Sequence, residues 1–186
     1  MHLRMGERVS LQQLLAGMAV ASGNDAAVAV AQSVAGNARN FVSQMNRKAR
    51  ALGMRHTVFK NPTGLPANGQ KTTARDLLTL SRAYLRTHPK AMRFHSAASL
   101  VHNGFAMYNT NPLLGVVEGV DGLKTGWTIA SGYNIIVTAT RGKVRLLGIV
   151  LGGASRSGRD DTARRLIEAG FRYPTSSRRV RAVLSR

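Results

Sequence analysis

The strongest constraint on the fold is a change of hydrophobic pattern along the 186-residue chain. In the first half, apolar residues recur at helical spacing, whereas two later runs are rich in β-branched residues, YNIIVTAT and VRLLGIVLG. The two runs are separated by Arg-Gly-Lys, whose glycine suits a hairpin turn. The chain is therefore predicted to pack helices on an antiparallel sheet, as an α/β or α+β layered architecture.

Capping residues predict where the first helices begin and end. Ser10 and Gln13 have the spacing of a capping box, and apolar residues then follow on one helical face. Two further helical stretches reach Gly36 and Gly53, where a glycine is a natural helix stop. Three helices are therefore expected between residues 10 and 53.

Two more helices are predicted further along the chain. Thr73 and Asp76 mark the start of one that runs to about Arg86 and stops before a proline. The last is an amphipathic stretch from about Asp160 to Ala169, which Gly170 is expected to end. This helix would close the domain after the two strands.

The charge of the chain is strongly positive. It carries 27 Lys and Arg against 8 Asp and Glu, a formal net charge of +19. Such an excess attracts polyanions, including nucleic acid, anionic lipids and acidic wall polymers. Nucleic-acid readers usually add stacking aromatics or a recognition helix, and the sequence offers neither, so no specific nucleic-acid site is expected. We expect a solvated basic face and an acid-free basic tail over residues 175–186 that favours anionic membranes or wall polymers.

Two short motifs carry candidate chemistry. Ser-Gly-Asn at residues 22–24 lies between two predicted helices, where a serine is often only a cap. Lys-Thr-Gly at residues 124–126 taken alone is an exposed lysine near a turn. Together, in this order and about a hundred residues apart, they match two of three signatures of penicillin-recognising serine enzymes, the third being Ser-x-x-Lys.

Longer stretches carry a resemblance to one family. GERVSLQQLLAGMAVASGNDAAVAVA, FVSQMNRKARALGMRHTVFKNPTGL, TTARDLLTLSRAYL and VDGLKTGWTIASGYNIIVTATR resemble the serine-type D-alanyl-D-alanine carboxypeptidases, the low-molecular-mass penicillin-binding proteins. The resemblance implies a β-lactamase/transpeptidase-like fold, with an antiparallel sheet, flanking helices and a helical subdomain. Residues 1–174 would be part of a catalytic domain that is incomplete at its N-terminus.

The resemblance also implies roles for residues around Lys-Thr-Gly. Lys124 would be an electrostatic clamp for the terminal carboxylate of the substrate, aided by Thr125. The strand that bears Lys-Thr-Gly would border the substrate cleft, and Gly126 would keep the edge of that strand free of a side chain. Trp127 would offer its backbone N–H to the oxyanion hole. Arg159 resembles the second cation of the family near the carboxylate.

Ser-Gly-Asn would supply the remaining roles. Ser22 would relay a proton to the leaving D-alanine, and Asn24 would hydrogen-bond the substrate backbone and orient the lysines. The implied partner is a peptidoglycan stem peptide ending in D-Ala-D-Ala, with β-lactams as inhibitors. The implied location is periplasmic or at the cell surface, with a signal peptide expected upstream of Met1.

One signature of the family is absent from the sequence. No serine of the chain is followed by a lysine three residues later, so the nucleophile is expected to lie before Met1. Three explanations for the missing signature remain open. The start codon was assigned too late, the gene is truncated or the chain deliberately shortened, or the chain is a non-catalytic descendant. Two hypotheses follow: a D-Ala-D-Ala carboxypeptidase acting through an acyl-serine, or a non-catalytic fragment that binds the cell wall or another anionic polymer. Neither a metal nor another cofactor is expected, because the five histidines lack ligand spacing and no phosphate-binding loop is present.

Overall fold

The computed structural model describes residues 1–185 and divides the chain into two compact units. The first unit comprises Met1–Thr110 and the second Asn111–Arg186. Each unit is described by itself. Within the described part of the chain, no helix is long and apolar enough to span a membrane, and no cluster of three potential metal ligands occurs.

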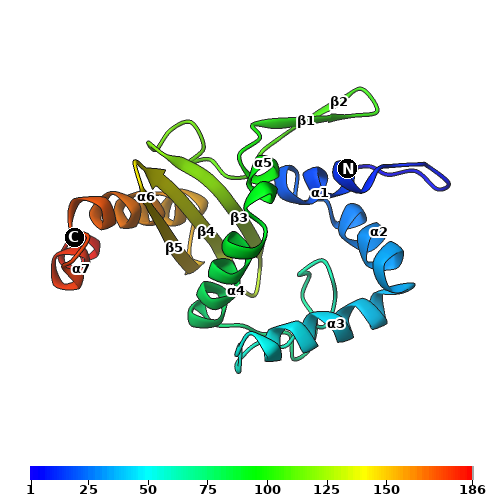
Figure 1. The fold of residues 1–186 in the computed structure, drawn as a ribbon, viewed down its shortest axis with the longest axis horizontal. Coiled ribbons are helices and arrows are strands. Elements are labelled where there is room, and N and C mark those ends of the chain that lie inside the picture. The colour runs from blue at the N-terminus through cyan, green and yellow to red at the C-terminus, as the bar shows by residue number, and fades with distance from the viewer. Residues whose placement is uncertain (186) are drawn as a thin grey trace. The chain divides into compact units, whose positions relative to one another are not determined.

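The first unit is mainly helical (Figure 1). Its helices are α1 (Leu11–Val20), α2 (Asn24–Ala35), α3 (Ala38–Ala51), α4 (Ala74–Thr87), the 3-10 turn η1 (Pro89–Ala91) and α5 (Met92–His95). The capping predictions are confirmed: Ser10 and Gln13 form a capping box, and Gly36 ends α2 with a φ of 77°. Thr73 caps α4 through its side chain, as predicted.

The core of the first unit lies between α1, α2 and a short hairpin. The hairpin strands are β1 (Ser99–His102) and β2 (Phe105–Tyr108), which the sequence analysis did not predict. Leu14, Ala26 and Val30 are buried in the core, and Leu100 and Met107 pack against the same cluster from the hairpin. Apolar contacts therefore position the turn between α1 and α2, which carries Ser-Gly-Asn.

The second unit is built on a three-stranded antiparallel sheet with the order β3-β4-β5. Its strands are β3 (Val120–Thr128), β4 (Gly132–Arg141) and β5 (Val144–Gly153). The predicted hairpin between β4 and β5 is confirmed, with Gly142 at a φ of 57°, where a glycine meets no steric penalty. Because β3 lies at one edge of this sheet, one side of Lys-Thr-Gly is not paired to a strand of the unit.

Two helices follow the sheet, α6 (Arg156–Arg172) and α7 (Ser177–Leu184). Helix α6 packs along β4 and β5 (Figure 1), where Ile167 joins a core with Ile135 and Val137. The predicted bounds of this helix were wrong, because it begins at the Ser155 cap and continues past Gly170. Gly170 packs beside Leu146, since a Cβ there would lie 2.8 Å from Cδ1 of Leu146 and would require that side chain to shift.

The predicted fold class is confirmed: an antiparallel sheet flanked by helices, with a helical part. The predicted domain boundary at residue 174 stays a prediction. The segment assigned to the basic tail contains helix α7, which the sequence analysis did not foresee.

Candidate functional site

The Ser-Gly-Asn turn joins α1 to α2 in the first unit. Ser22 is exposed and has a φ of 56°, a left-handed conformation that is uncommon for residues other than glycine. The Gly23 N–H donates to the Gly17 carbonyl at 3.1 Å, which fixes the turn, and Gly23 is the N-cap of α2. Ser22 is therefore not the helix cap. Strained backbone conformations of this kind cluster at functional sites, which supports a role for the Ser22 hydroxyl.

Asn24 is the first residue of α2, and the next residue anchors that end of the helix. The Asp25 carboxylate accepts hydrogen bonds from the N–H groups of Leu3 and Ala26 and from the amino group of Met1. Burial alone would raise the pKa of Asp25, but these hydrogen bonds lower the pKa to about 2. The charged carboxylate thus holds residues 1–3 against the start of α2.

Lys-Thr-Gly lies in the middle of the edge strand β3. The β4 partners of Lys124, Thr125 and Gly126 are Ile136, Ile135 and Asn134, respectively. Gly126 is exposed, and a Cβ there would meet no described atom within 4 Å. Its φ also lies outside the left-handed region, so neither packing nor backbone geometry within the described residues requires a glycine. An edge kept bare in this way suits close approach of an extended ligand.

Lys124 is half-buried and carries a perturbed charge. Its Nζ donates to the Thr125 carbonyl at 2.8 Å. Burial, and secondly the positive charge of Arg159, lower the pKa of Lys124 from its ordinary value to about 8. The structure therefore brings Lys124 and Arg159 into electrostatic contact within the second unit, although they are 35 residues apart in sequence.

Arg159 lies in the first turns of α6 with only 4% of its surface exposed. The Arg159 Nε donates to Asp160 Oδ1 at 2.7 Å, and the Arg159 Nη2 lies 2.5 Å from the same oxygen. The Arg159 Nη1 donates to the Asn134 carbonyl at 3.4 Å. The carboxylate fixes one side of the guanidinium fork, and its other N–H groups can meet an anion. The sequence analysis missed Asp160, although an acid directly after the expected arginine was a usable signal.

Trp127 is 56% exposed near the end of β3. Its ring lies beside that of Tyr133, with centroids 5.7 Å apart. Its backbone role in an oxyanion hole stays a prediction.

The predicted site residues fall into two groups. The first unit holds Ser22 and Asn24, and the second holds Lys124, Thr125, Gly126, Trp127 and Arg159. Within the second unit, the structure brings together two cations, Lys124 and Arg159, and paired cations are suited to binding a carboxylate. The individual roles of all seven residues remain predictions.

Comparison with known proteins gives a consistent result. The family described as D-alanyl-D-alanine carboxypeptidase matches residues 1–155. D-alanyl-D-alanine carboxypeptidase DacD of Escherichia coli K12 is 43% identical over 171 residues, covering 91% of this chain and 44% of that protein. The chain thus spans less than half the length of this curated relative.

Solved structures agree with the sequence matches. Penicillin binding protein 6B from Escherichia coli has a TM-score of 0.87 at 43% identity, covering 90% of this chain and 53% of that one. Penicillin-Binding Protein D2 from Listeria monocytogenes, in its ampicillin-bound form, has a TM-score of 0.82 at 35% identity, covering 90% of this chain and 70% of that one. A second structure of the Listeria protein is of its cefotaxime-bound form.

Proposed function

The chain belongs to the D-alanyl-D-alanine carboxypeptidase family, a family of serine-type hydrolases, and from that premise we propose that it supplies much of the substrate site of such an enzyme. The substrate would be a peptidoglycan stem pentapeptide ending in D-Ala-D-Ala. The enzyme would remove the last D-alanine through an acyl-serine intermediate and would bind β-lactams as inhibitors. Its place of action would be the periplasm or the cell surface.

The observation that carries this proposal is the pair of cations, Lys124 and Arg159, in the unit whose strand β3 carries the exposed Gly126. The terminal carboxylate of the substrate would lie near Lys124 and the guanidinium of Arg159, with the Thr125 hydroxyl as a further donor. Gly126 would let the peptide run along the strand without a clash. The Trp127 N–H would then face the carbonyl oxygen that becomes negative during attack.

Ser22 and Asn24 would serve the leaving group. When a serine oxygen attacks the scissile carbonyl, the C–N bond breaks and the D-alanine nitrogen must gain a proton. The Ser22 hydroxyl would deliver that proton, and the Asn24 amide would hold the peptide backbone. The left-handed turn at Ser22 supports this role, because it places an exposed serine on a backbone that the Gly23–Gly17 hydrogen bond fixes.

The 186 residues contain no Ser-x-x-Lys, so this chain alone is proposed not to acylate. Losing a nucleophile typically costs about a million-fold in rate. A labelled penicillin should give no covalent band with the 186-residue chain on a denaturing gel, whereas a form extended in frame with Ser-x-x-Lys should label within minutes. Substitution of that new serine by alanine is the control.

Two results would overturn this assignment. If the 186-residue chain becomes labelled and Ser22→Ala removes the label, Ser22 is a nucleophile and not a proton relay. If an extended form labels equally well with Lys124→Ala and Arg159→Ala, these cations do not bind the carboxylate.

Helix α7 favours a second role, that of a non-catalytic module bound to anionic membranes or wall polymers. Arg178, Arg179 and Arg181 are exposed on it, while the half-buried Val183 accepts a hydrogen bond from Arg165 of α6 through its carbonyl. Each basic residue near an anionic membrane contributes about 1 kcal/mol, so such attachment should weaken sharply with salt. Sedimentation with phosphatidylglycerol vesicles tests this role, and equal binding after deletion of residues 175–186 would exclude it.

A further inference from the structure

The middle of the chain has an unusual distribution of charge. Residues 26–117 include twelve Lys and Arg but one acid, Asp76. Asp76 is only 4% exposed, and its carboxylate accepts from the His56 N–H and the Thr57 hydroxyl. All twelve cations are exposed, and among the described residues none of them forms an ion pair with a carboxylate. Their field is therefore open to solvent and to external anions.

Part of this charge forms a line on α4. Arg75, Arg82 and Arg86 fall within an arc of about 40° of one helix face and span about 16 Å along the helix axis, at 100° and 1.5 Å per residue. We call these three residues the α4 stripe. A row of like charges along one helix face matches a polymer whose anionic groups repeat along a line.

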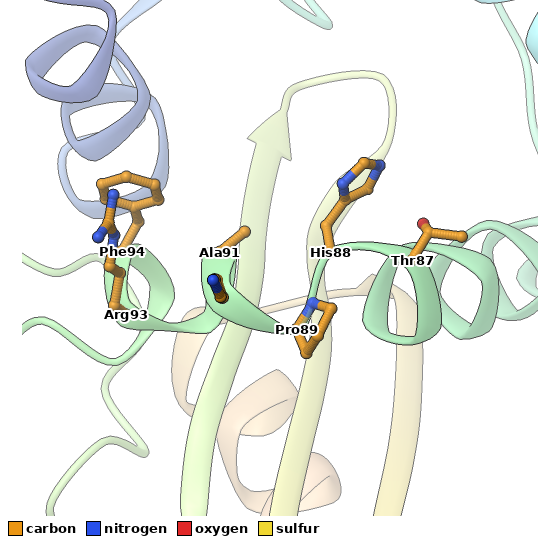
Figure 2. A pocket seen from close by; sticks show the side chains of 7 residues that line it. Thr87, His88, Pro89, Ala91, Arg93 and Phe94 are labelled. Atoms are coloured by element: carbon orange, nitrogen blue, oxygen red, sulfur yellow. The ribbon is translucent and has the colours of Figure 1, made fainter.

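A cavity lies where the stripe ends. It has a volume of about 450 Å³ and is lined by Thr87, His88, Pro89, Lys90, Ala91, Arg93 and Phe94. No acid lines it. The Arg93 guanidinium lies over the Phe94 ring, 4.8 Å from the ring centroid, and Figure 2 shows the two side chains together at one end of the cavity. This contact restrains a cation at the cavity wall.

We propose that the α4 stripe and this cavity form one binding surface for a linear anionic polymer that carries phosphate or carboxylate groups. Successive anionic groups meet Arg75, Arg82 and Arg86, and one group enters the cavity beside Lys90 and Arg93. This surface shares no residue with those assigned to peptide cleavage or with α7.

The surface chemistry argues against two other partners. Stacking of nucleic-acid bases needs exposed aromatic faces, but Tyr84 on α4 is half-buried with its hydroxyl bonded to His95, and Arg93 covers Phe94. A helix lying in a membrane needs an apolar face, whereas Leu78 is the one large apolar side chain that is exposed in the described segment 74–95.

Binding of the 186-residue chain to labelled inorganic polyphosphate and to labelled poly-L-glutamate, measured by fluorescence anisotropy over a salt series, tests the proposal. The stripe variant is Arg75→Gln with Arg82→Gln and Arg86→Gln, and the cavity variant is Lys90→Gln with Arg93→Gln. A matched control, Arg39→Gln with Arg47→Gln and Arg50→Gln on α3, removes the same charge from exposed positions. Circular dichroism verifies that each variant is folded.

The stripe variant should bind at least about 10-fold more weakly. The slope of log K against log salt should become smaller in magnitude by about 2, because each lost phosphate contact reduces it by about 0.7. The cavity variant should lose less, and the control should stay within about two-fold of the parent. The stronger of the two probes identifies the anionic group as phosphate or carboxylate.

Four results would overturn the proposal. Equal loss in the α3 control would mean that binding follows total charge. Loss only in an Arg178→Gln, Arg179→Gln and Arg181→Gln variant would place binding on α7. Tighter binding of single-stranded DNA than of polyphosphate would indicate a nucleic-acid surface, and tighter binding of phosphatidylglycerol vesicles a membrane surface. None of these measurements depends on penicillin labelling, so they stand apart from the test of the proposed enzyme.

Discussion

The two units of the molecule use their acidic residues differently. In the first unit each acid accepts a hydrogen bond from a backbone N–H group: Glu7 from Arg4, Asp25 from Leu3 and Asp76 from His56. In the second unit each acid lies within ion-pair distance of an arginine: Glu118 and Glu168 of Arg141, Asp121 of Arg145, Asp160 of Arg159 and Asp161 of Arg164. Carboxylates of the first unit thus bind backbone nitrogen atoms, including the Met1 amino group, whereas those of the second unit bind arginine side chains.

The difference explains what each unit can offer to a ligand. Because the acids of the first unit bind backbone groups, its lysines and arginines stay unneutralised and available to polyanions. In the second unit, Asp160 holds Arg159 in one orientation, which prepares a cation for a single carboxylate. The spread-out positive charge of the first unit suits non-specific attachment to a polyanion, whereas the oriented guanidinium of Arg159 suits recognition of a single carboxylate.

The largest effect should come from Asp76, the buried backbone anchor of the first unit. Asp76→Ala leaves the His56 N–H and the Thr57 hydroxyl without their acceptor, and should lower the free energy of unfolding by about 3 kcal/mol. Urea denaturation measures it. Asp161→Ala, which removes an exposed ion pair of the second unit, should cost less than about 0.5 kcal/mol. If both variants lost a similar free energy of unfolding, the acids of the two units would not differ in their contribution to stability.

The second-largest effect should come from Lys124, whose substitution should stabilise the chain instead of destabilising it. Its pKa of about 8 in the folded chain lies below its ordinary value of 10.5, so at pH 7 the buried charge beside Arg159 costs stability. Lys124→Met should raise the free energy of unfolding at pH 7 by about 2 kcal/mol.

The pH dependence of this effect provides a check. Between pH 8 and 10.5 the unfolded chain binds more protons at residue 124 than the folded chain, so the stability of the parent should rise relative to Lys124→Met. Parallel denaturation curves over this range measure the difference. An advantage of the variant that does not change with pH would mean that the lysine charge carries no cost.

The smallest effect should come from Glu168 on the surface of α6. Arg141 donates to both of its oxygens, at 2.6 and 3.0 Å, and these hydrogen bonds lower the pKa of Glu168 below 4.5. The group therefore contributes stability above pH 4.5 that is lost as the pH falls below it. Glu168→Gln should cost about 1 kcal/mol at pH 7, since solvent weakens this half-exposed pair. The difference in stability between parent and variant should narrow as the pH falls below 4.5, and a difference that does not change with pH would contradict the ion-pair account.

Local sequence predicted much of the fold because its signals act over a few residues. The capping box at Ser10, the glycine after α2 and the turn between β4 and β5 depend on neighbouring residues only, and all three are confirmed. The β1–β2 hairpin was missed because its strands are short and are held by contacts with the core of α1 and α2. The end of α6 was misplaced because Gly170, a natural stop in the local sequence, lies inside the helix, where it packs beside Leu146.

For the site, the sequence by itself determined the motifs, the total charge and the family, since these depend on residue identity and order. Only the tertiary structure decided which charges meet. It placed the charge of Arg159 near Lys124, turned Asp160 onto the guanidinium, and left the arginines of α4 in solvent. The physical reason is that pKa values and ion pairs depend on burial and on distances of a few ångströms, which chain folding sets between residues far apart in sequence.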